Sequence, residues 1–346
     1  MQERKFNPSI SIIRVLAMFL IVFGHVCSWA GIYLYQFGSL GVEIFLFISG
    51  YFYGKKQIKN KMKYLLDRTK RIMFPFWVLT FFLSMYLLFT DEILLAFQQM
   101  AEALLNLIGF SKLVTFPTAI GSKHLSAISH CWFLTIIMIC YIITAIIKGS
   151  KIERQVEEHA RLFLIIGIFA QIGIAFLGVQ LSYILQYFIG YFFCRCEEKV
   201  TYKSYKFFVE LSAVTVVLCV GRFIANRFLD NTIFYDDVIA RLSFNALAIW
   251  VIYIIDFVCS RFSSFSNKVA KSKIWISIDK LSYPIYLTHY MFVKTPFNVD
   301  EYIKGDVLQV LCIIAFSVMS AIVLYLICVL IGKINNKFIK VHQPNS

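Results

Sequence analysis

Charged residues are scarce in this sequence, and their scarcity argues against a soluble globular domain. Only 16% of the 346 residues are Asp, Glu, Lys or Arg, whereas 59% are hydrophobic and the mean hydropathy is +0.72. Soluble domains contain about 25% charged and about 45–50% apolar residues. The apolar residues also gather in long runs separated by short basic segments, which is typical of a membrane protein.

The patterns of a metal or nucleic-acid-binding protein are also missing. The nine cysteines lie mostly inside apolar runs, without a CxxC pair or a Cys/His cluster at zinc spacing, so no metal is expected. The formal net charge is +14, but Lys and Arg form no separate basic domain, and we expect no nucleic-acid partner. The preference of cytoplasmic loops for Lys and Arg explains the excess positive charge.

The long apolar runs predict an all-α polytopic membrane protein, a bundle of about ten transmembrane helices. The first run carries Arg14 and lacks an A-x-A cleavage site, so we expect a retained helix rather than a signal peptide. The expected spans are 9–31, 38–54, 73–90, 129–147, 161–178, 180–195, 206–225, 238–258, 274–292 and 306–331.

Two further segments complete one expected domain over 1–346. Residues 91–110 place polar side chains among apolar ones at helical spacing, which predicts an amphipathic helix at the membrane interface. Residues 332–346 are expected to form a short cytoplasmic tail. No repeat or soluble appendage interrupts this arrangement.

The distribution of positive charge predicts the orientation in the membrane. With the N-terminus inside, the inner segments hold 25 of the Lys and Arg residues and the outer segments hold six. Because cytoplasmic segments are enriched in these residues, we expect both termini in the cytoplasm and the chain in the plasma (inner) membrane.

Two ionisable residues lie in the first span. Arg14 and His25 are eleven residues apart, which is about three turns and about 16 Å of rise on one helix face. An ionisable group at such depth costs about 2.5–3.5 kcal/mol and calls for a partner or a function. Alternatively, Arg14 reaches the inner headgroups and His25 is a buried neutral hydrogen-bonding group.

The second span contains a carboxylate, Glu43. Counted inward from the outer ends, Glu43 and His25 lie at similar depth, so we expect the carboxylate to orient the imidazole as a general base. The alternative is a structural Glu paired with a Tyr or Arg of another helix. Ser49 is a substrate-binding candidate, although Ser49 and Gly50 also suit close helix packing.

Arg68 and Arg71 are three residues apart on one face of a basic segment that leads into the third span. Arginine forks suit phosphates, so this pair is a candidate site for a phosphorylated ligand on the cytoplasmic side. Contact with anionic lipid is the alternative.

Four further candidates lie at the outer ends of the spans at 129–147 and 274–292. They are His130, Trp132, Tyr286 and His289. The tryptophan and the tyrosine also suit an interfacial aromatic belt. The two histidines join His25 in one layer, but without a recognised metal-ligand spacing.

These motifs resemble the membrane-bound acyltransferase 3 family, in its stand-alone form. The resemblance covers nearly the whole chain and rests on five motifs in order: Arg14 with His25; Gly41, Val42, Glu43, Phe45, Phe47, Ser49, Gly50 and Tyr51; Arg68, Arg71 and Pro75; Trp132, Phe133 and Leu134; and Ser282, Ile285, Tyr286, Leu287 and His289. The chain departs from the family pattern ahead of Arg14, where Ser11, Ile12 and Ile13 replace the usual Asp.

The resemblance implies an O-acetyltransferase that takes an acetyl group from cytoplasmic acetyl-CoA. The implied acceptor is a hydroxyl of a cell-surface saccharide, polyprenyl-linked forms included. Arg68 and Arg71, with Arg14, would hold the nucleotide phosphates, and His25 with Glu43 would be catalytic. Trp132, His130, Tyr286, His289 and Ser49 would line the acceptor side. A flippase for a lipid-linked sugar, with His25 and Glu43 as a proton relay, and a scaffold without chemistry are the alternatives.

Overall fold

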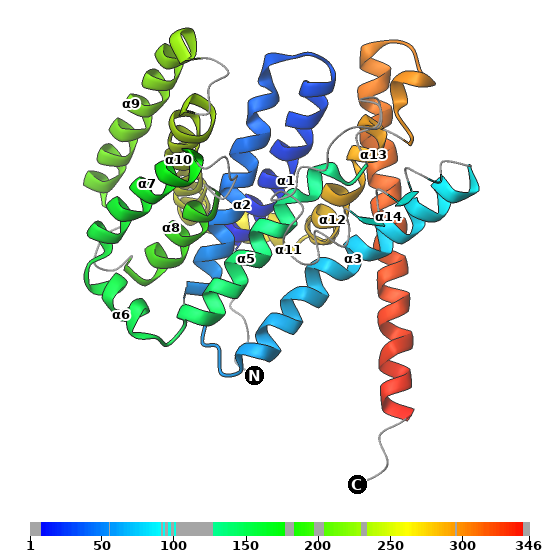
Figure 1. The fold of residues 1–346 in the computed structure, drawn as a ribbon, viewed down its shortest axis with the longest axis horizontal. Coiled ribbons are helices and arrows are strands. Elements are labelled where there is room, and N and C mark those ends of the chain that lie inside the picture. The colour runs from blue at the N-terminus through cyan, green and yellow to red at the C-terminus, as the bar shows by residue number, and fades with distance from the viewer. Residues whose placement is uncertain are drawn as a thin grey trace.

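The computed structural model describes residues 8–54, 56–90, 127–176, 183–196, 204–229, 234–294 and 296–341, with a few positions between 93 and 101. The elements in this part of the chain are all helical (Figure 1), and short 3₁₀ and π segments join them. The α-helices are α1 (Pro8–Trp29), α2 (Phe37–Gly54), α3 (Lys61–Phe89), α5 (Trp132–Ile147), α6 (Lys151–Glu158), α7 (Ala160–Phe176), α8 (Tyr183–Cys196), α9 (Tyr205–Leu229), α10 (Ala240–Arg261), α11 (Ser263–Lys271), α12 (Lys273–Thr288), α13 (Tyr290–Val293) and α14 (Asp306–Val341).

Six helical segments of the described chain are long and apolar enough to cross a membrane. They are α1, 33–54 with α2, α3, α9, α10 and the first 28 residues of α14. The other four expected spans fall on the shorter helices α5, α7, α8 and α12, which have 14 to 17 residues. The multi-pass helical architecture is thus confirmed, and six of the ten expected spans are full-length within the described residues.

Two expectations at the edges of the bundle have different outcomes. Most of the amphipathic segment at 91–110 lies outside the described residues. The expected tail at 332–346 is helical as far as Val341, because α14 continues past the predicted end of the last span. Figure 1 shows the end of α14 projecting beyond the other helices.

Helix α2 packs between α1 and α8, and glycines bring the backbones together. A Cβ atom on Gly50 would lie 1.8 Å from the Tyr187 carbonyl oxygen, and one on Gly190 would lie 2.1 Å from the Phe47 carbonyl oxygen. Small residues at helix interfaces allow such close contact in membranes, where packing replaces the hydrophobic effect as the driving force. Close helix packing, which the sequence offers as an alternative role for Ser49 and Gly50, therefore applies at Gly50.

Helices α1 and α12 run parallel and are joined by polar contacts at a nearly constant sequence separation. The Trp275 indole N–H donates to the Ser11 hydroxyl over 3.0 Å, at a separation of 264 residues. One turn further on, Arg14 Nε donates to Asp279 Oδ1 over 2.7 Å, at a separation of 265. The same direction of α1 and α12 agrees with their expected places as first and ninth spans.

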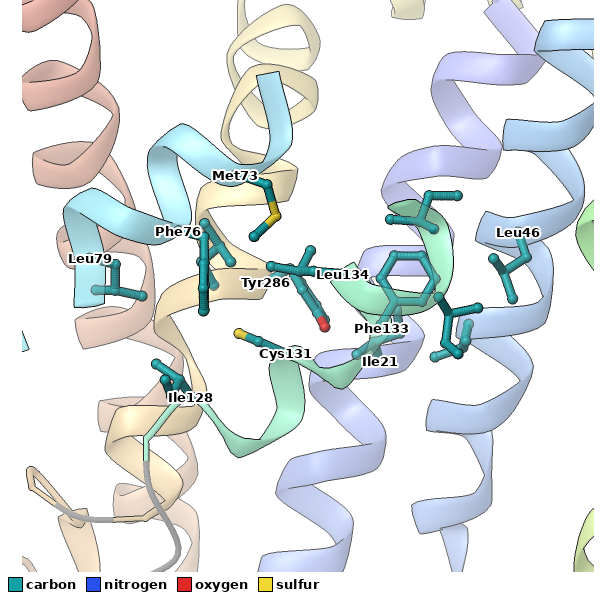
Figure 2. Close-up of a cluster of buried hydrophobic side chains, with 14 of the residues drawn as sticks. Ile21, Leu46, Met73, Phe76, Leu79, Ile128, Cys131, Phe133, Leu134 and Tyr286 are labelled. Atoms are coloured by element: carbon teal, nitrogen blue, oxygen red, sulfur yellow. The ribbon is translucent and has the colours of Figure 1, made fainter. Parts of the chain in front are cut away.

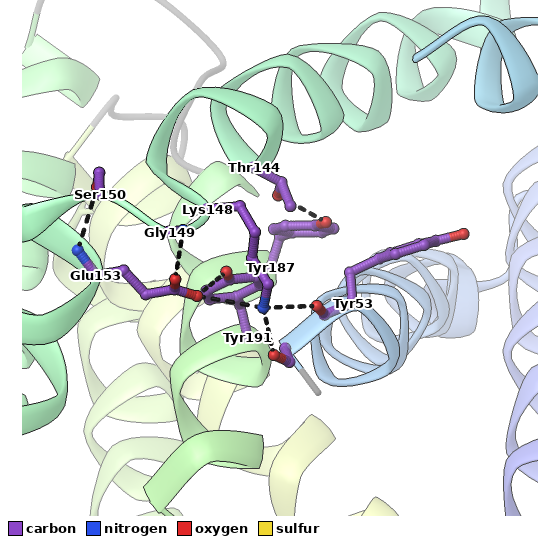
Figure 3. Close-up of polar contacts among 9 residues, drawn as sticks. Tyr53, Thr144, Lys148, Gly149, Ser150, Glu153, Tyr187 and Tyr191 are labelled. Atoms are coloured by element: carbon purple, nitrogen blue, oxygen red, sulfur yellow. Dashed lines mark hydrogen bonds and ion pairs between the residues drawn. The ribbon is translucent and has the colours of Figure 1, made fainter. Parts of the chain in front are cut away.

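A half-buried lysine and a buried glutamate join the other ends of α2, α5 and α8 (Figure 3). Lys148, which follows α5, donates to the Gly54 carbonyl oxygen over 2.7 Å and pairs with Glu153 over 3.2 Å. The Glu153 carboxylate also accepts from the Gly149 N–H and the Tyr191 hydroxyl. Each oxygen of this buried carboxylate therefore has a donor, as a buried charge requires.

Candidate functional site

Three histidines that are distant in the sequence meet near the outer end of the bundle expected from the charge pattern. His25 lies in the last two turns of α1, His289 between α12 and α13, and His130 just before α5. His25 Nδ1 lies 2.7 Å from His289 Nε2, and the two rings stack with their centroids 5.0 Å apart. The His130 ring stands edge-on to the His289 ring at 4.9 Å. The sequence prediction that these imidazoles share one layer is in accord with this geometry.

The backbone of α12 holds two of these rings. The Tyr286 carbonyl oxygen accepts from His130 Nε2 and from His289 Nδ1, each over 2.8 Å. In return, the Tyr286 hydroxyl donates to the His130 carbonyl oxygen over 2.9 Å. No group of three His, Cys, Asp or Glu residues among those described has the geometry of a metal site.

A cavity of ≈ 200 Å³ adjoins the histidines. Its wall includes His25, His130, Trp132, Tyr183 and Tyr286, and Ser28 and Ser39 add hydroxyl groups. A second hollow of ≈ 280 Å³, lined by Ser28, Gly31, Ile32, Tyr33 and Tyr35, shares two of its residues with the first. The cavity therefore reaches the loop between α1 and α2.

Three of the five expected substrate-binding residues line this cavity: Trp132, His130 and Tyr286. His289 is not part of its wall and is fully buried, because it lies behind His25. Ser49 is not part of the wall either. It lies on α2 beside Gly50, about 16 Å of helical rise beyond Gly38 at the cavity.

Glu43 lies deeper than His25, which corrects the expectation that the two share one level. A Cβ on Gly24, next to His25, would meet the Gly38 backbone, whereas one on Gly41 would meet Ala17. Since Glu43 is five residues beyond Gly38, it is displaced from the imidazole level by about 7.5 Å. The register between α1 and α2, and not the distance from each helix end, sets the relative depth of the two side chains.

The partner of Glu43 is an arginine of another helix. Arg241 Nη1 of α10 donates to Glu43 Oε1 over 3.1 Å, and both side chains are buried. The Arg241 guanidinium lies over the Tyr183 ring, 3.6 Å from its centroid, and Tyr183 is in the cavity wall. The hydrogen-bonding partner of His25 is therefore His289, and among the described residues Glu43 is linked to the cavity wall through Arg241 and Tyr183.

Arg14 does not join Arg68 and Arg71 in a free basic cluster. Its Nε and Nη2 atoms both bind the Asp279 carboxylate. An acidic partner for this arginine is thus supplied by α12. The Asp279 carboxylate balances the charge of the Arg14 guanidinium, and the ion pair joins α1 to α12.

Arg68 and Arg71 lie in the first half of α3, by the end of α2 that is remote from His25. Arg68 Nη1 donates to the Tyr53 hydroxyl, and Arg68 Nε is buried without a hydrogen-bond partner among the described residues. Arg71 is exposed. Arg68 Nε is thus the donor that this geometry leaves for a ligand at the expected cytoplasmic face.

Sequence reasoning missed Arg241, Asp279 and Tyr183. A signal for the first two was present, because both are charged residues inside expected spans and such residues seek partners. Tyr183 carries no signal of this kind in a sequence with 19 tyrosines.

Comparison with known proteins gives the chain a family. Comparison with curated proteins and with solved structures returned no match. The model of the acyltransferase 3 family, described as an acyltransferase domain, matches residues 7–326. The match covers the helices from α1 to most of α14. It includes the three histidines, the cavity, Arg14, and the pair Arg68 and Arg71. The chain is therefore a membrane protein of the acyltransferase 3 family, whose members are transferases.

Proposed function

We propose that this protein transfers an acetyl group from cytoplasmic acetyl-CoA to a hydroxyl group of a cell-surface or lipid-linked saccharide. The observation that carries the proposal is that His25, in the wall of a cavity that reaches the α1–α2 loop, is hydrogen-bonded to His289 behind it. A paired imidazole beside a cavity lined with hydroxyl groups suits general-base catalysis of transfer to an alcohol.

In the proposed reaction, the acceptor oxygen attacks the thioester carbonyl carbon while its proton passes to His25. The carbon–sulfur bond then breaks, and the leaving CoA sulfur takes the proton back from the imidazolium. The products are an acetyl ester and free CoA, and His25 is neutral again. A two-step variant, in which His25 attacks first and forms an acetyl-imidazole, uses the same groups.

On the donor side, Arg68 and Arg71 would bind the nucleotide phosphates, with both termini in the cytoplasm. Arg68 Nε has no hydrogen-bond partner among the described residues, and this supports the assignment, because guanidinium groups bind phosphates by charge-assisted hydrogen bonds. Arg71 lies three residues further on at an exposed position. Arg14 would act by holding α1 against α12, since its guanidinium binds Asp279.

The route of the pantetheine arm would follow a cluster of buried apolar side chains (Figure 2). Met73, two residues beyond Arg71, belongs to this cluster together with Leu134 and Tyr286. Since Tyr286 is also part of the cavity wall, the cluster connects the first half of α3 with the imidazoles. These side chains would separate to admit the arm.

The decisive experiment supplies labelled acetyl-CoA to inside-out membrane vesicles that contain the protein. We expect label in saccharide material, and a loss of about 10²–10⁴-fold in His25→Ala. His159→Ala is the matched control, because His159 is exposed at the end of α6, and it should transfer at the normal rate. Normal transfer by a folded His25→Ala variant would refute the proposed base.

The same vesicles distinguish the rival functions. A flippase would move a lipid-linked sugar without depositing label, and a scaffold would do neither. Label retained on the protein in the absence of acceptor, and absent in His25→Ala, would identify the acetyl-imidazole variant. Mass spectrometry of surface glycans from cells with and without the protein would then identify the acceptor.

A further inference from the structure

We infer that His289 is a positioning residue that fixes the tautomer of His25, so that Nε2 of His25 is the nitrogen that takes the acceptor proton. The inference rests on the proposed function and assigns His289 a place behind the base rather than in the acceptor site. It follows from the partners of the two rings.

The first step is the protonation of His289. Its Nδ1 lies 2.8 Å from the Tyr286 carbonyl oxygen and 3.3 Å from the Ile285 carbonyl oxygen. Carbonyl oxygens only accept hydrogen bonds, so His289 Nδ1 carries a proton. In a neutral imidazole the other nitrogen is then an acceptor, and His289 Nε2 is unprotonated.

The second step transfers this constraint to His25. Its Nδ1 lies 2.7 Å from His289 Nε2. Because that atom accepts, His25 Nδ1 must donate, and the His25 lone pair lies on Nε2. The cavity therefore adjoins an imidazole whose free basic nitrogen is defined. If an acetyl-imidazole forms, the new carbon–nitrogen bond is made at this same atom.

The third step concerns the positive charge that appears when His25 takes the acceptor proton. The carbonyl groups of Ile285 and Tyr286 belong to the last turn of α12, where a helix carries partial negative charge. His289 connects His25 Nδ1 to these carbonyls. In this protein the end of a helix thus occupies the place that a carboxylate has in an Asp–His pair.

The surroundings of His25 agree with a neutral resting state. In the described part of the chain, its ring faces His289, His130 ahead of α5, and Tyr290 of α13, at centroid distances of 5.0, 6.0 and 5.0 Å. The orientation of the His130 ring is itself fixed, because its Nε2 donates to the Tyr286 carbonyl oxygen. None of these three neighbours is a carboxylate that would stabilise an imidazolium, so the orienting contact for His25 is its hydrogen bond with His289.

Solid-state NMR of protein with ¹⁵N-labelled histidine, in lipid vesicles, tests the tautomer directly. The chain has six histidines, and a His25→Gln sample identifies the signals of His25 by difference. We expect His25 to be protonated at Nδ1 and unprotonated at Nε2, and His289→Leu to abolish this preference. A proton on Nε2 in the wild type, or an unchanged His25 spectrum in His289→Leu, would overturn the inference.

Acetyl transfer in the vesicle assay adds a functional test. The Gln side chain can still accept from His25 Nδ1, so His289→Gln should retain activity within about tenfold. His289→Leu has no acceptor and should lose about 10²-fold or more in kcat, with an unchanged KM for acetyl-CoA. Equal losses in two folded variants would contradict the inference. If the wild type transfers no acetyl group, the proposed function fails, and the NMR result still decides the tautomer.

Discussion

At the scale of single residues, the pairing of buried charges governs what each side chain can do. Glu43 is fully buried, and its carboxylate is balanced by Arg241 on α10. The guanidinium in turn stacks on Tyr183 at 3.6 Å, a cation–π contact that gains strength away from water. The ion pair thus fixes one wall of the cavity, while His25 takes its orientation from a different element.

Glu43→Gln should therefore act mainly on stability. It leaves the Arg241 charge buried and unbalanced, and we expect the free energy of unfolding to fall by about 3–5 kcal/mol. The double variant Glu43→Gln/Arg241→Met removes both charges and should recover most of that loss. Thermal unfolding in detergent micelles measures both effects.

Acetyl transfer by the same variants distinguishes a structural role of Glu43 from a role in the reaction. If Glu43 acts on the cavity only through Arg241 and Tyr183, the stable double variant regains activity. A double variant that is stable but inactive would mean that the Glu43 carboxylate takes part in the reaction.

At the scale of helices, the parallel pair α1 and α12 sets the geometry of the site. The contacts of Ser11 with Trp275, Arg14 with Asp279 and His25 with His289 recur at separations of 264, 265 and 264 residues. A sliding of one helix along the other would break all three contacts together. The ion pair near the start of the helices therefore helps to align the imidazoles near their ends.

Reversing the Arg14–Asp279 pair tests this alignment. We expect Arg14→Asp and Asp279→Arg each to lower acetyl transfer by about 10²-fold, as small misplacements of reacting groups do. The double variant Arg14→Asp/Asp279→Arg restores the ion pair with opposite polarity and should recover activity to within about tenfold. Labelled acetyl-CoA and inside-out vesicles provide the measurement.

The double variant also decides between two roles for Arg14. If Arg14 binds the nucleotide phosphates, as the family resemblance implies, an Asp at that position repels them whichever residue is at position 279. The KM for acetyl-CoA would then stay raised in the double variant. Recovery of both kcat and KM would assign Arg14 to the alignment of the helices.

At the scale of the whole molecule, the sequence predicts the features that depend on local pattern. It does not predict the side-chain contacts that depend on the register between helices. Hydropathy is a property of consecutive residues, so it locates the apolar helices but not the short polar helices α6 and α11, and the motifs identify the family. Which side chains touch depends on contacts between helices up to 265 residues apart. For this reason Glu43 was expected beside His25 but binds Arg241, and His289 was expected in the acceptor site but binds His25.

The stability of the bundle should depend on pH through the buried carboxyl of Glu153. This residue lies on α6, outside the expected membrane spans, and its contacts join the ends of α2, α5 and α8. Burial raises the pKa of Glu153, but the Tyr191 hydroxyl, the Gly149 N–H and the charge of Lys148 outweigh it and lower the pKa below its ordinary value of 4.5. A carboxyl with a lowered folded pKa stabilises the protein above the unfolded value, and this contribution is lost as the pH falls through the folded value. The wild type should therefore lose its advantage over Glu153→Gln below pH 4.5.

Thermal unfolding in detergent, scanned from about pH 7 to about pH 3, compares the wild type with two variants. At neutral pH, we expect Glu153→Gln to be less stable by about 1–3 kcal/mol, because charge-assisted hydrogen bonds to a buried group are lost. Glu158→Gln, on the exposed face of the same helix, is the matched control and should follow the wild type at every pH. A constant difference between Glu153→Gln and the wild type over the whole range would show that the carboxylate charge does not hold α2, α5 and α8 together.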